Sequence, residues 1–552
     1  MNVMLHIHGA AGTVTGSCHR LVTPGGSLLI DCGMFQGPKS LRALNYRRFP
    51  FDAAEIAAVL LTHAHIDHTG LLPKLALAGF RGPVWTTEAT RDLLRWLLPD
   101  AGAIQENDVE RLNRRNTRRG EPPVTPIYTK ADAEASLALL QPRAYDDWFE
   151  PLAGVRARFR NAGHILGSAF VELEVDADPR PIRFLFSGDL GPSDKALQPD
   201  PAMPLACDVA VLESTYGDSV RERRTAAERR ALLGRELTAG LAAGGNVIVP
   251  VFAVERTQEI LDDIAQLKRH GALPSVAVFL DSPLAGRTTE VFRLHREALD
   301  RADDGHAFSG GDFRLVETVE QSKALGRIHG GAVVLAGSGM CDAGRVKHHL
   351  KDHLWRPDST VLFVGYQAPG TLGALIRDGA PRVRIHGEEV SVKARVRRLD
   401  GYSGHADRDE LVAWMQPVLH GLGSVLLVHG EPDAFAGLAD GLARSGLPRE
   451  RIVVPDLDQS FAFGHRDGRW MAETSDASAP RLPAQEAKAR RDWHNEYAEA
   501  LLELRAALLH PADDASRRRL LGEVRRVIDA HRGRQRQAWG EAKESPSPTA
   551  RG

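Results

Sequence analysis

Cysteine is scarce in this chain of 552 residues, which holds only Cys18, Cys32, Cys207 and Cys341. No two of them form a C-x-x-C pair, so neither a cysteine zinc site nor a disulfide framework is indicated. This usage fits a reducing compartment, and we expect a cytoplasmic protein.

Long apolar runs and an excess of charge of one sign are also missing. No apolar run reaches the roughly 18 residues that a membrane helix needs, so we expect no membrane span. The N-terminal stretch MNVMLHIHGAAG has neither the basic nor the long apolar region of a signal peptide. The formal net charge is only -2, so any site for a polyanion must be a local basic surface.

Short apolar runs that end in polar or glycine-rich loops recur along the chain. Examples are SLLIDCG (27–33), IRFLFSGDLG (182–191) and GNVIVPVF (245–252). Amphipathic patterns such as VERTQEILDDIAQL (254–267) follow several of these runs and indicate helices. Strand-like and helix-like segments in alternation predict an α/β fold.

The composition changes near residue 466. Residues 466–483 are polar and rich in Pro, Ser and Ala, which predicts a linker. Two amphipathic helical patterns separated by Pro511 follow, so we expect a helical extension over 484–540. We expect the tail 541–552 to be disordered.

The stretch THAHIDHTG (62–70) follows directly on the apolar run AAVLL and is rich in metal ligands. Its ligands are His63, His65, Asp67 and His68. Alternate residues of an extended segment point the same way, so His63 and His65 can share one ion while Asp67 and His68 face a second. Imidazole and carboxylate donors without thiolate suit Zn²⁺, with Mn²⁺ as the alternative.

One short loop cannot complete two coordination shells, so further ligands are expected at the ends of other strands. The candidates are His164 in AGHILGSA, Asp189 in FSGDLG and His429 in LLVHGEP. Asp189 is the natural bridging carboxylate. Asp31, which ends SLLID, can orient a ligand histidine from behind or serve a structural role only.

THAHIDHTG, AGHILGSA and FSGDLG resemble the signature motifs of the metallo-β-lactamase superfamily. The resemblance implies an αββα sandwich with a dinuclear metal site at one edge. It also implies how the ligands are shared. The first metal would be held by His63, His65, His164 and Asp189, and the second by Asp67, His68, Asp189 and His429.

Three later stretches narrow the resemblance. LESTYG (212–217), GYSGHAD (401–407) and LLVHG (426–430) resemble motifs A, B and C of the β-CASP nucleases, a subgroup with a second α/β domain inserted late in the chain. PVFAVERTQEIL, LDSPLA, AGSGMCDAGR and YQAPGTLG are similar to segments of that insert. A histidine at motif C, here His429, resembles the RNA-directed branch. Several motifs are similar to those of bacterial and archaeal homologues of the polyadenylation-factor endonuclease.

The resemblance implies a domain order. We expect the metallo-β-lactamase domain in two parts, 1–207 and 396–465, on either side of a β-CASP domain over 208–395. The helical extension lies outside the resemblance, which covers about residues 3–465.

The resemblance also implies a mechanism, in which a dinuclear metal-activated hydroxide attacks the phosphorus of an RNA phosphodiester. Asp67 would accept or orient the proton of that hydroxide. His405 would protonate the leaving oxygen, and Glu213 would keep His405 charged. We expect endonucleolytic cleavage, with an additional 5′-exonuclease activity left open.

The predicted partner is RNA, and a homodimer is left open. AGSGMCDAGR is a glycine-rich loop entering a helix, where backbone N–H groups can bind a phosphate, although an ordinary tight turn explains the same pattern. The predicted RNA-phosphate contacts are Arg256, Ser338, Gly339 and Ser403. A surface ion pair is the alternative role of Arg256. Ala374 departs from relatives, which often carry arginine after GTLG.

Two other enzymatic functions are compatible with the metal ligands. A small-molecule metallo-hydrolase of the glyoxalase or lactonase type would not need Glu213, His405 or the inserted domain. A DNA-directed β-CASP nuclease is the other alternative. A scaffold that only binds RNA is a further alternative from a different class, and the complete ligand set argues against it.

Overall fold

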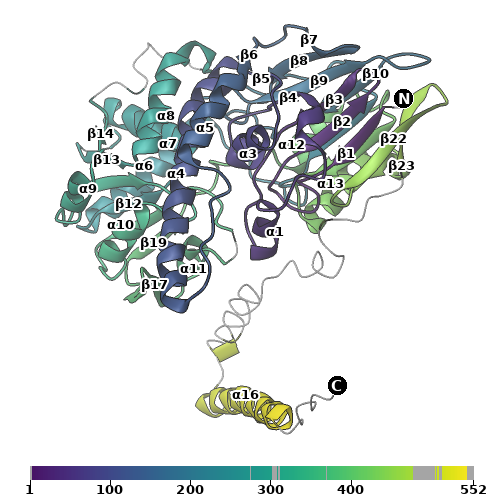
Figure 1. Ribbon diagram of the computed structural model, residues 1–552. Coiled ribbons are helices and arrows are strands. Elements are labelled where there is room, and N and C mark those ends of the chain that lie inside the picture. The colour runs from purple at the N-terminus through teal and green to yellow at the C-terminus, as the bar shows by residue number, and fades with distance from the viewer. Residues whose placement is uncertain are drawn as a thin grey trace. The chain divides into compact units, whose positions relative to one another are not determined.

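The computed structural model describes residues 3–273, 275–300, 308, 311–368, 370–475, 481, 504, 507–508 and 513–543 (Figure 1). The chain divides into two compact units, Met1–Arg490 and Arg491–Gly552. Among the described residues, no helix is both long and apolar enough to cross a membrane.

Two large sheets form the sandwich of the first unit. One has the strand order β23-β22-β1-β2-β3-β4-β5-β6, and the other has the order β21-β20-β11-β10-β9-β8-β7. The strands of the first sheet are β1 (Met4–Ile7), β2 (His19–Thr23), β3 (Gly26–Ile30), β4 (Ile56–Leu60), β5 (Val84–Thr86), β6 (Leu140–Pro142), β22 (Gln459–Arg466) and β23 (Arg469–Ser475). Those of the second are β7 (Phe149–Leu152), β8 (Val155–Asn161), β9 (Ala169–Val175), β10 (Ile182–Phe186), β11 (Val209–Glu213), β20 (Ser424–Val428) and β21 (Ile452–Val453).

Alternation along the strands builds the layers of the sandwich. Val209 and Val211 of β11 lie in a buried cluster shared by both sheets. Ala210 and Leu212 point the other way and pack with α12 (Arg408–Met415) and α13 (Pro432–Arg444). Successive side chains of a strand face opposite sides, so one apolar strand serves both layers.

Helices also cover the outer face of the other sheet. Val59 of β4 belongs to a cluster with leucines of α3 (Leu72–Leu77) and α4 (Glu88–Arg119). The sheets therefore have helices on both outer faces, which is the predicted αββα arrangement. The short helices α1 (Lys39–Leu44), α2 (Ile66–Thr69) and α5 (Lys130–Ser136) complete this part.

The inserted domain is built on a six-stranded sheet with the order β14-β13-β15-β12-β16-β19. Every strand pair in it is parallel. Its strands are β12 (Val247–Pro250), β13 (Ala277–Asp281), β14 (Arg314–Leu315), β15 (Ala332–Ala336), β16 (Thr360–Phe363) and β19 (Arg395–Arg398). Its helices are α6 (Ala226–Ala242), α7 (Arg256–Arg269), α8 (Pro283–Leu294), α9 (Val319–Leu325), α10 (Val346–His353) and α11 (Leu372–Arg377). A two-stranded sheet joins β17 (Arg382–Ile385) to β18 (Glu388–Ser391).

The helix α4 joins the sandwich to the inserted domain. Asp92 on α4 pairs with His295, which follows α8, at 2.9 Å between Oδ2 and Nε2. Arg287 of α8 lies over the ring of Trp96 on α4. One buried cluster includes residues of both domains, so the two share a continuous core.

Three of the expected domain and linker boundaries differ from those in the structure. The strand β11 pairs with β10 and β20 of the sandwich, so the expected boundary at 208 is wrong and the insert begins after β11. The strand β19 pairs with β16, so the insert includes 395–398. The expected linker 466–483 is also wrong at its start, because β23 pairs with β22 there.

The second unit contains α16 (Asp514–Lys543). This helix continues past residue 540, where the helical extension was expected to end. Most of the first helical pattern of the extension and the tail 544–552 lie outside the described residues.

Candidate metal centre

The predicted metal ligands meet at one edge of the sandwich, where several strands end. His63 and His65 follow β4, and the helix α2 that begins at Ile66 carries Asp67 and His68. The other ligands lie on three further segments. His164 is in the β8–β9 connection, Asp189 follows β10, and His429 follows β20.

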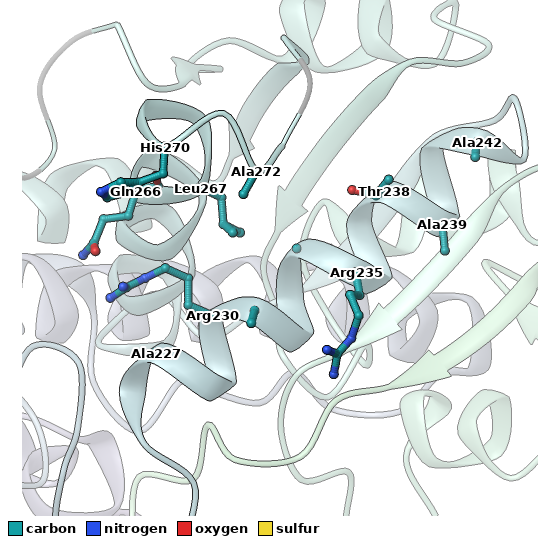
Figure 2. A pocket seen from close by; sticks show the side chains of 12 residues that line it. Ala227, Arg230, Arg235, Thr238, Ala239, Ala242, Gln266, Leu267, His270 and Ala272 are labelled. Atoms are coloured by element: carbon teal, nitrogen blue, oxygen red, sulfur yellow. The ribbon is translucent and has the colours of Figure 1, made fainter.

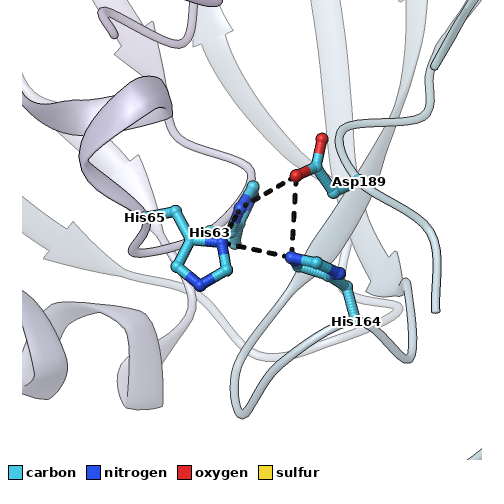
Figure 3. Close-up of side chains that lie close together, drawn as sticks. All are labelled: His63, His65, His164 and Asp189. Atoms are coloured by element: carbon cyan, nitrogen blue, oxygen red, sulfur yellow. Dashed lines mark hydrogen bonds and ion pairs between the residues drawn. The ribbon is translucent and has the colours of Figure 1, made fainter. Parts of the chain in front are cut away.

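His63, His65, His164 and Asp189 form what we call the first ligand group (Figure 3). His65 Nδ1 lies 3.0 Å from His63 Nε2 and 3.1 Å from His164 Nε2. Asp189 Oδ2 lies 3.5 Å from His63 Nε2 and 3.6 Å from His164 Nε2. Four donor atoms thus surround a single point, with the number and chemistry of ligands that zinc takes in proteins.

Asp67, His68 and His429, together with Asp189, form the second ligand group. His68 Nε2 and His429 Nε2 are 3.3 Å apart, and Asp67 Oδ2 is 3.6 Å from His429 Nε2. Asp189 offers its other oxygen here, since Oδ1 lies 3.2 Å from His68 Nε2 and 3.6 Å from His429 Nε2. One carboxylate therefore faces both groups.

A cation fits this donor set. Asp189 Oδ1 is buried and accepts no hydrogen bond from the described residues, although His68 Nε2 is close. A buried carboxylate oxygen without a donor is costly unless a positive charge compensates it. The donors are imidazole and carboxylate only, the set that Zn²⁺ and Mn²⁺ accept.

Burial keeps the imidazoles of the first ligand group neutral. It lowers the pKa of His63 and His164 well below the usual value, and neighbouring histidines lower it further. It lowers the pKa of His65 to about 4. Neutral imidazole is the form that binds a metal ion.

Both carboxylates of the centre are held ionised. Burial would raise the pKa of Asp189, but the charges of His429 and His68 outweigh it and hold that pKa well below the usual value. Burial likewise opposes ionisation of Asp67, and its hydrogen bond to His429 brings the pKa down. Each carboxylate is therefore in its ligating form.

The ring orientations of His68 and His429 are fixed from behind. Asp31 Oδ2 lies 2.7 Å from His68 Nδ1, and Asp31 also accepts hydrogen bonds from Thr62 N at 2.8 Å and Ser17 Oγ at 3.1 Å. His429 Nδ1 lies 3.0 Å from Thr215 Oγ1. Partners of this kind fix the tautomer and the direction of a metal-binding imidazole.

Two histidines of the first ligand group are held by hydrogen bonds to neutral groups. His63 Nδ1 lies 3.1 Å from Thr62 Oγ1, and His164 Nδ1 donates to the backbone carbonyl of Gly404 at 2.7 Å. Gly404 immediately precedes His405, so the GYSGHAD loop touches the metal centre through its backbone as well.

His405 and Glu213 form a pair beside the first ligand group. His405 Nδ1 lies 3.2 Å from Glu213 Oε1 and 3.8 Å from Asp189 Oδ2. Glu213 is fully buried and accepts a hydrogen bond from Leu190 N at 2.7 Å. Burial opposes a charge on His405, but Glu213 and Asp189 outweigh it and raise the pKa of His405. The arrangement places a proton donor next to the metal ligands.

Three family models match the chain. They are the Beta-Casp domain over residues 257–376, the Zn-dependent metallo-hydrolase RNA specificity domain over 389–455 and the metallo-beta-lactamase superfamily over 11–145. A Thermus thermophilus protein named as a ribonuclease is 42% identical over 447 residues, which cover 79% of this chain and 95% of that protein. This chain belongs to the β-CASP family of metallo-β-lactamase proteins.

More distant relatives of this β-CASP protein carry a different name. Transcription termination factor FttA of Cenarchaeum symbiosum is 29% identical over 470 residues, covering 82% of this chain and 70% of that protein. The factor of the same name from Methanosarcina mazei is 29% identical over 465 residues, with the same shares of the two chains. The family and its metal-binding domains make this β-CASP protein a metal-dependent hydrolase.

Two of the predicted RNA contacts of this β-CASP protein, Arg256 and Ser403, form hydrogen bonds within the protein. Arg256 opens α7 and donates to Glu259 Oε2 at 2.9 Å, as in the ion-pair alternative. The Ser403 hydroxyl donates to the His405 carbonyl at 3.2 Å and accepts from His405 N at the same distance. Ser403 therefore holds the turn that presents His405.

The other two predicted contacts, Ser338 and Gly339, lie in the loop after β15. Ser338 Oγ is 3.4 Å from the Ala343 carbonyl, which closes a turn. Ala374, where relatives often carry arginine, is buried in α11, while Arg377 donates to the Gln367 carbonyl at 3.0 Å. The nearby arginine thus supports the loop from within.

A buried ion pair between the two domains of this β-CASP protein has no sequence signature. Lys195 Nζ donates to the His164 carbonyl at 2.6 Å and lies 3.3 Å from Glu255 Oε1. Glu255 Oε2 accepts from Leu166 N at 3.1 Å and from Gln198 Nε2 at 3.0 Å. Burial raises the pKa of Glu255 to about 7, against the pull of Lys195. The loop carrying His164 is thus tied to the inserted domain.

A groove of about 630 Å³ lies elsewhere, along α6 and the end of α7 (Figure 2). Its lining includes the small residues Gly234 and Ala239 and the polar residues Arg230, Gln266 and His270. None of the predicted site residues lines it, so this groove is separate from the metal centre.

Proposed function

We propose that this protein is a zinc-dependent ribonuclease that hydrolyses phosphodiester bonds of RNA, cutting within the strand. The observation that carries the proposal is Asp189, whose two oxygens face two different ligand groups. Two divalent ions held by these groups would suit in-line displacement at phosphorus. The ribonuclease name of the Thermus relative and the RNA specificity model over residues 389–455 support RNA as the substrate.

The ligand groups assign the residues that would hold each ion. The first ligand group would bind one Zn²⁺, the second would bind another, and Asp189 would contact both. Bound there, two divalent ions supply a nucleophile by lowering the pKa of a water molecule and neutralise charge on the phosphoryl oxygens.

The remaining steps fall to side chains of this protein. Asp67 is ionised, so it orients the attacking water through a hydrogen bond. His405 Nδ1 faces Glu213, so the other ring nitrogen, Nε2, gives its proton to the leaving oxygen. Cleavage of the bond between phosphorus and the leaving 3′-oxygen gives one product with a 3′-hydroxyl end and one with a 5′-phosphate end.

The His405–Glu213 pair also argues against a small-molecule hydrolase. A thiol released from a thioester leaves readily as the thiolate, so that reaction does not need a proton donor beside the metal ligands. The four cysteines are buried and unbridged, which fits action in the reducing cytoplasm.

Cleavage of a circular RNA tests the proposal, because a circle has no end from which an exonuclease could start. We expect the zinc-loaded protein to open the circle and to cut a 5′-labelled linear RNA, with 5′-phosphate and 3′-hydroxyl product ends. Turnover of a lactone or thioester with both RNAs intact would contradict it, as would cleavage of DNA alone. Sedimentation of the same preparation distinguishes a monomer from a homodimer.

A further inference from the structure

We propose that Tyr366 and Phe252 form a nucleobase-binding subsite, on which unpaired bases of the substrate stack beside the catalytic centre. The inference rests on the proposed ribonuclease function and adds the residues that hold the strand. The two side chains are 53% and 43% exposed, and they lie on loops of the inserted domain.

Exposed aromatic side chains are rare in this protein. The composition is only 6% aromatic. In the described part of the chain, five Phe, Trp or Tyr side chains are exposed: Tyr46, Trp96, Phe252, Trp355 and Tyr366. Exposing an aromatic ring to water is unfavourable, so two on neighbouring loops require an explanation.

The parallel sheet of the inserted domain brings the two rings to one edge. Phe252 follows β12 and Tyr366 follows β16, and these strands are direct neighbours. The loop with Gly339 follows β15, the other neighbour of β12. In open parallel sheets, ligands bind in the crevice outside the carboxyl ends of the strands.

Ring contacts connect Tyr366 to the catalytic pair. The rings of Tyr366 and Tyr216 are 6.5 Å apart between centroids and meet edge to face. The ring of Tyr216 is in turn 6.0 Å from His405. Tyr216 is held by Arg221, whose guanidinium lies 4.8 Å from the ring centroid. The ring of Tyr216 therefore lies between Tyr366 and His405, the proposed proton donor, and about half of the Tyr366 side chain remains exposed to solvent.

The loop that carries Gly339 contacts Phe252 and the residue next to Tyr366. Gln367 Nε2, next to Tyr366, donates to the Gly339 carbonyl at 2.8 Å. A Cβ at Gly339 would approach Phe252 Cδ2 to 2.6 Å, so only glycine lets the phenyl ring lie against this loop. Phe252 thus lies against this glycine loop, and the residue next to Tyr366 is anchored to the same loop.

This order of groups matches a single strand of RNA. Unpaired bases stack on aromatic rings whatever their sequence, while the backbone follows polar and basic groups. A duplex keeps its bases stacked on each other and gains nothing from the rings. The subsite therefore favours unpaired segments without selecting a base.

Kinetics with a short unstructured RNA test the subsite. Tyr366→Ala and Phe252→Ala should each raise KM by about 5- to 100-fold, the cost of one lost base stack. Tyr366→Phe keeps the ring and should stay close to the unaltered protein. Trp355→Ala is the matched control, because Trp355 is 55% exposed and precedes the same strand β16 that Tyr366 follows.

Abasic substrates identify the contact itself. An abasic nucleotide at the position that stacks on Tyr366 should weaken binding to the unaltered protein and have no further effect on Tyr366→Ala. Equal KM values for Tyr366→Ala, Phe252→Ala and Trp355→Ala would overturn the subsite, as would an abasic penalty that persists in Tyr366→Ala. Failure of the unaltered protein to cut RNA would instead overturn the proposed function.

Discussion

The two ligand groups that share Asp189 are assembled from different parts of the chain. The histidines of the first ligand group all precede the inserted domain. The second ligand group pairs His68 with His429, 361 residues later, at 3.3 Å between the Nε2 atoms. The first ligand group takes all its donors from the chain before the insert, whereas the second closes only after the chain has returned from it. The second ligand group is therefore complete only when the chain before the inserted domain and the chain after it have folded together.

The two groups also differ in what stands behind their histidines. In the first ligand group, His164 donates to a backbone carbonyl and His63 faces a hydroxyl. In the second, His68 faces the carboxylate of Asp31. A carboxylate behind an imidazole makes it a stronger ligand than a neutral partner does. The second ligand group, whose members are farthest apart in the sequence, is thus the one with a charged partner behind a ligand histidine.

Asp189→Asn removes what the two groups have in common and should have the largest effect. Cleavage should fall by at least about 10³-fold, because several kcal/mol of charge stabilisation depend on the metals. Metal analysis should find less bound zinc at both sites. A variant that keeps both ions and its activity would show that Asp189 does not bridge the groups.

His164→Ala and His429→Ala form a matched pair that separates the groups. Each should lower the zinc content from about two ions to about one per chain, since each group supplies one tetrahedral shell. Both should lose cleavage, because each ion is needed. Loss of both ions from either variant would mean that the groups do not fill independently.

His405→Ala tests whether the acid is separate from both groups. The rate should fall by about 10²- to 10⁴-fold, the usual contribution of a general acid. The zinc content should stay unchanged, and Glu213→Gln should slow cleavage in the same direction. Zinc loss in His405→Ala would make His405 a ligand and end the distinction.

Asp31→Asn probes the support behind the second ligand group and should have the smallest effect. Affinity for one of the two ions should fall by about 10- to 100-fold, the usual cost of losing such a partner. Titration with a chelator should show one weakened site and one unaltered site. Equal weakening of both would show that Asp31 supports His63 through Thr62 as much as it supports His68 directly.

Much of the metal centre could be predicted because its ligands lie in short motifs. Local spacing alone separated His63 and His65 from Asp67 and His68, and the turn into α2 is what redirects the chain between them. The position of Asp189 after an apolar strand made it a candidate ligand, and the family resemblance implied that both ions would share it. The αββα arrangement came from the family resemblance, and the two faces of β11 show its physical basis.

Other features depend on pairings that a sequence does not display. An apolar run such as β11 can join any parallel sheet, and only its pairing with β20 assigns it to the sandwich. The polar strand β23 looks like a linker until β22 supplies its hydrogen-bonding partners. The sequence left Arg256 between an RNA contact and an ion pair, and the structure shows that it pairs with Glu259 on the same helix. Lys195 and Glu255 are single residues without a motif.

The buried ion pair of Lys195 and Glu255 limits which inserted domains can be combined with this sandwich. Lys195 belongs to the sandwich, whereas Glu255 and Glu259, whose Oε1 lies 3.9 Å from Lys195 Nζ, belong to the insert. A chimera with a foreign insert that lacks both glutamates would leave an ammonium group buried without a counterion. Breaking a buried pair on one side costs about 3–5 kcal/mol. That group also donates to the carbonyl of His164, so the damage would reach the metal centre. Domains of such proteins can be recombined only if both halves of the pair are transferred together.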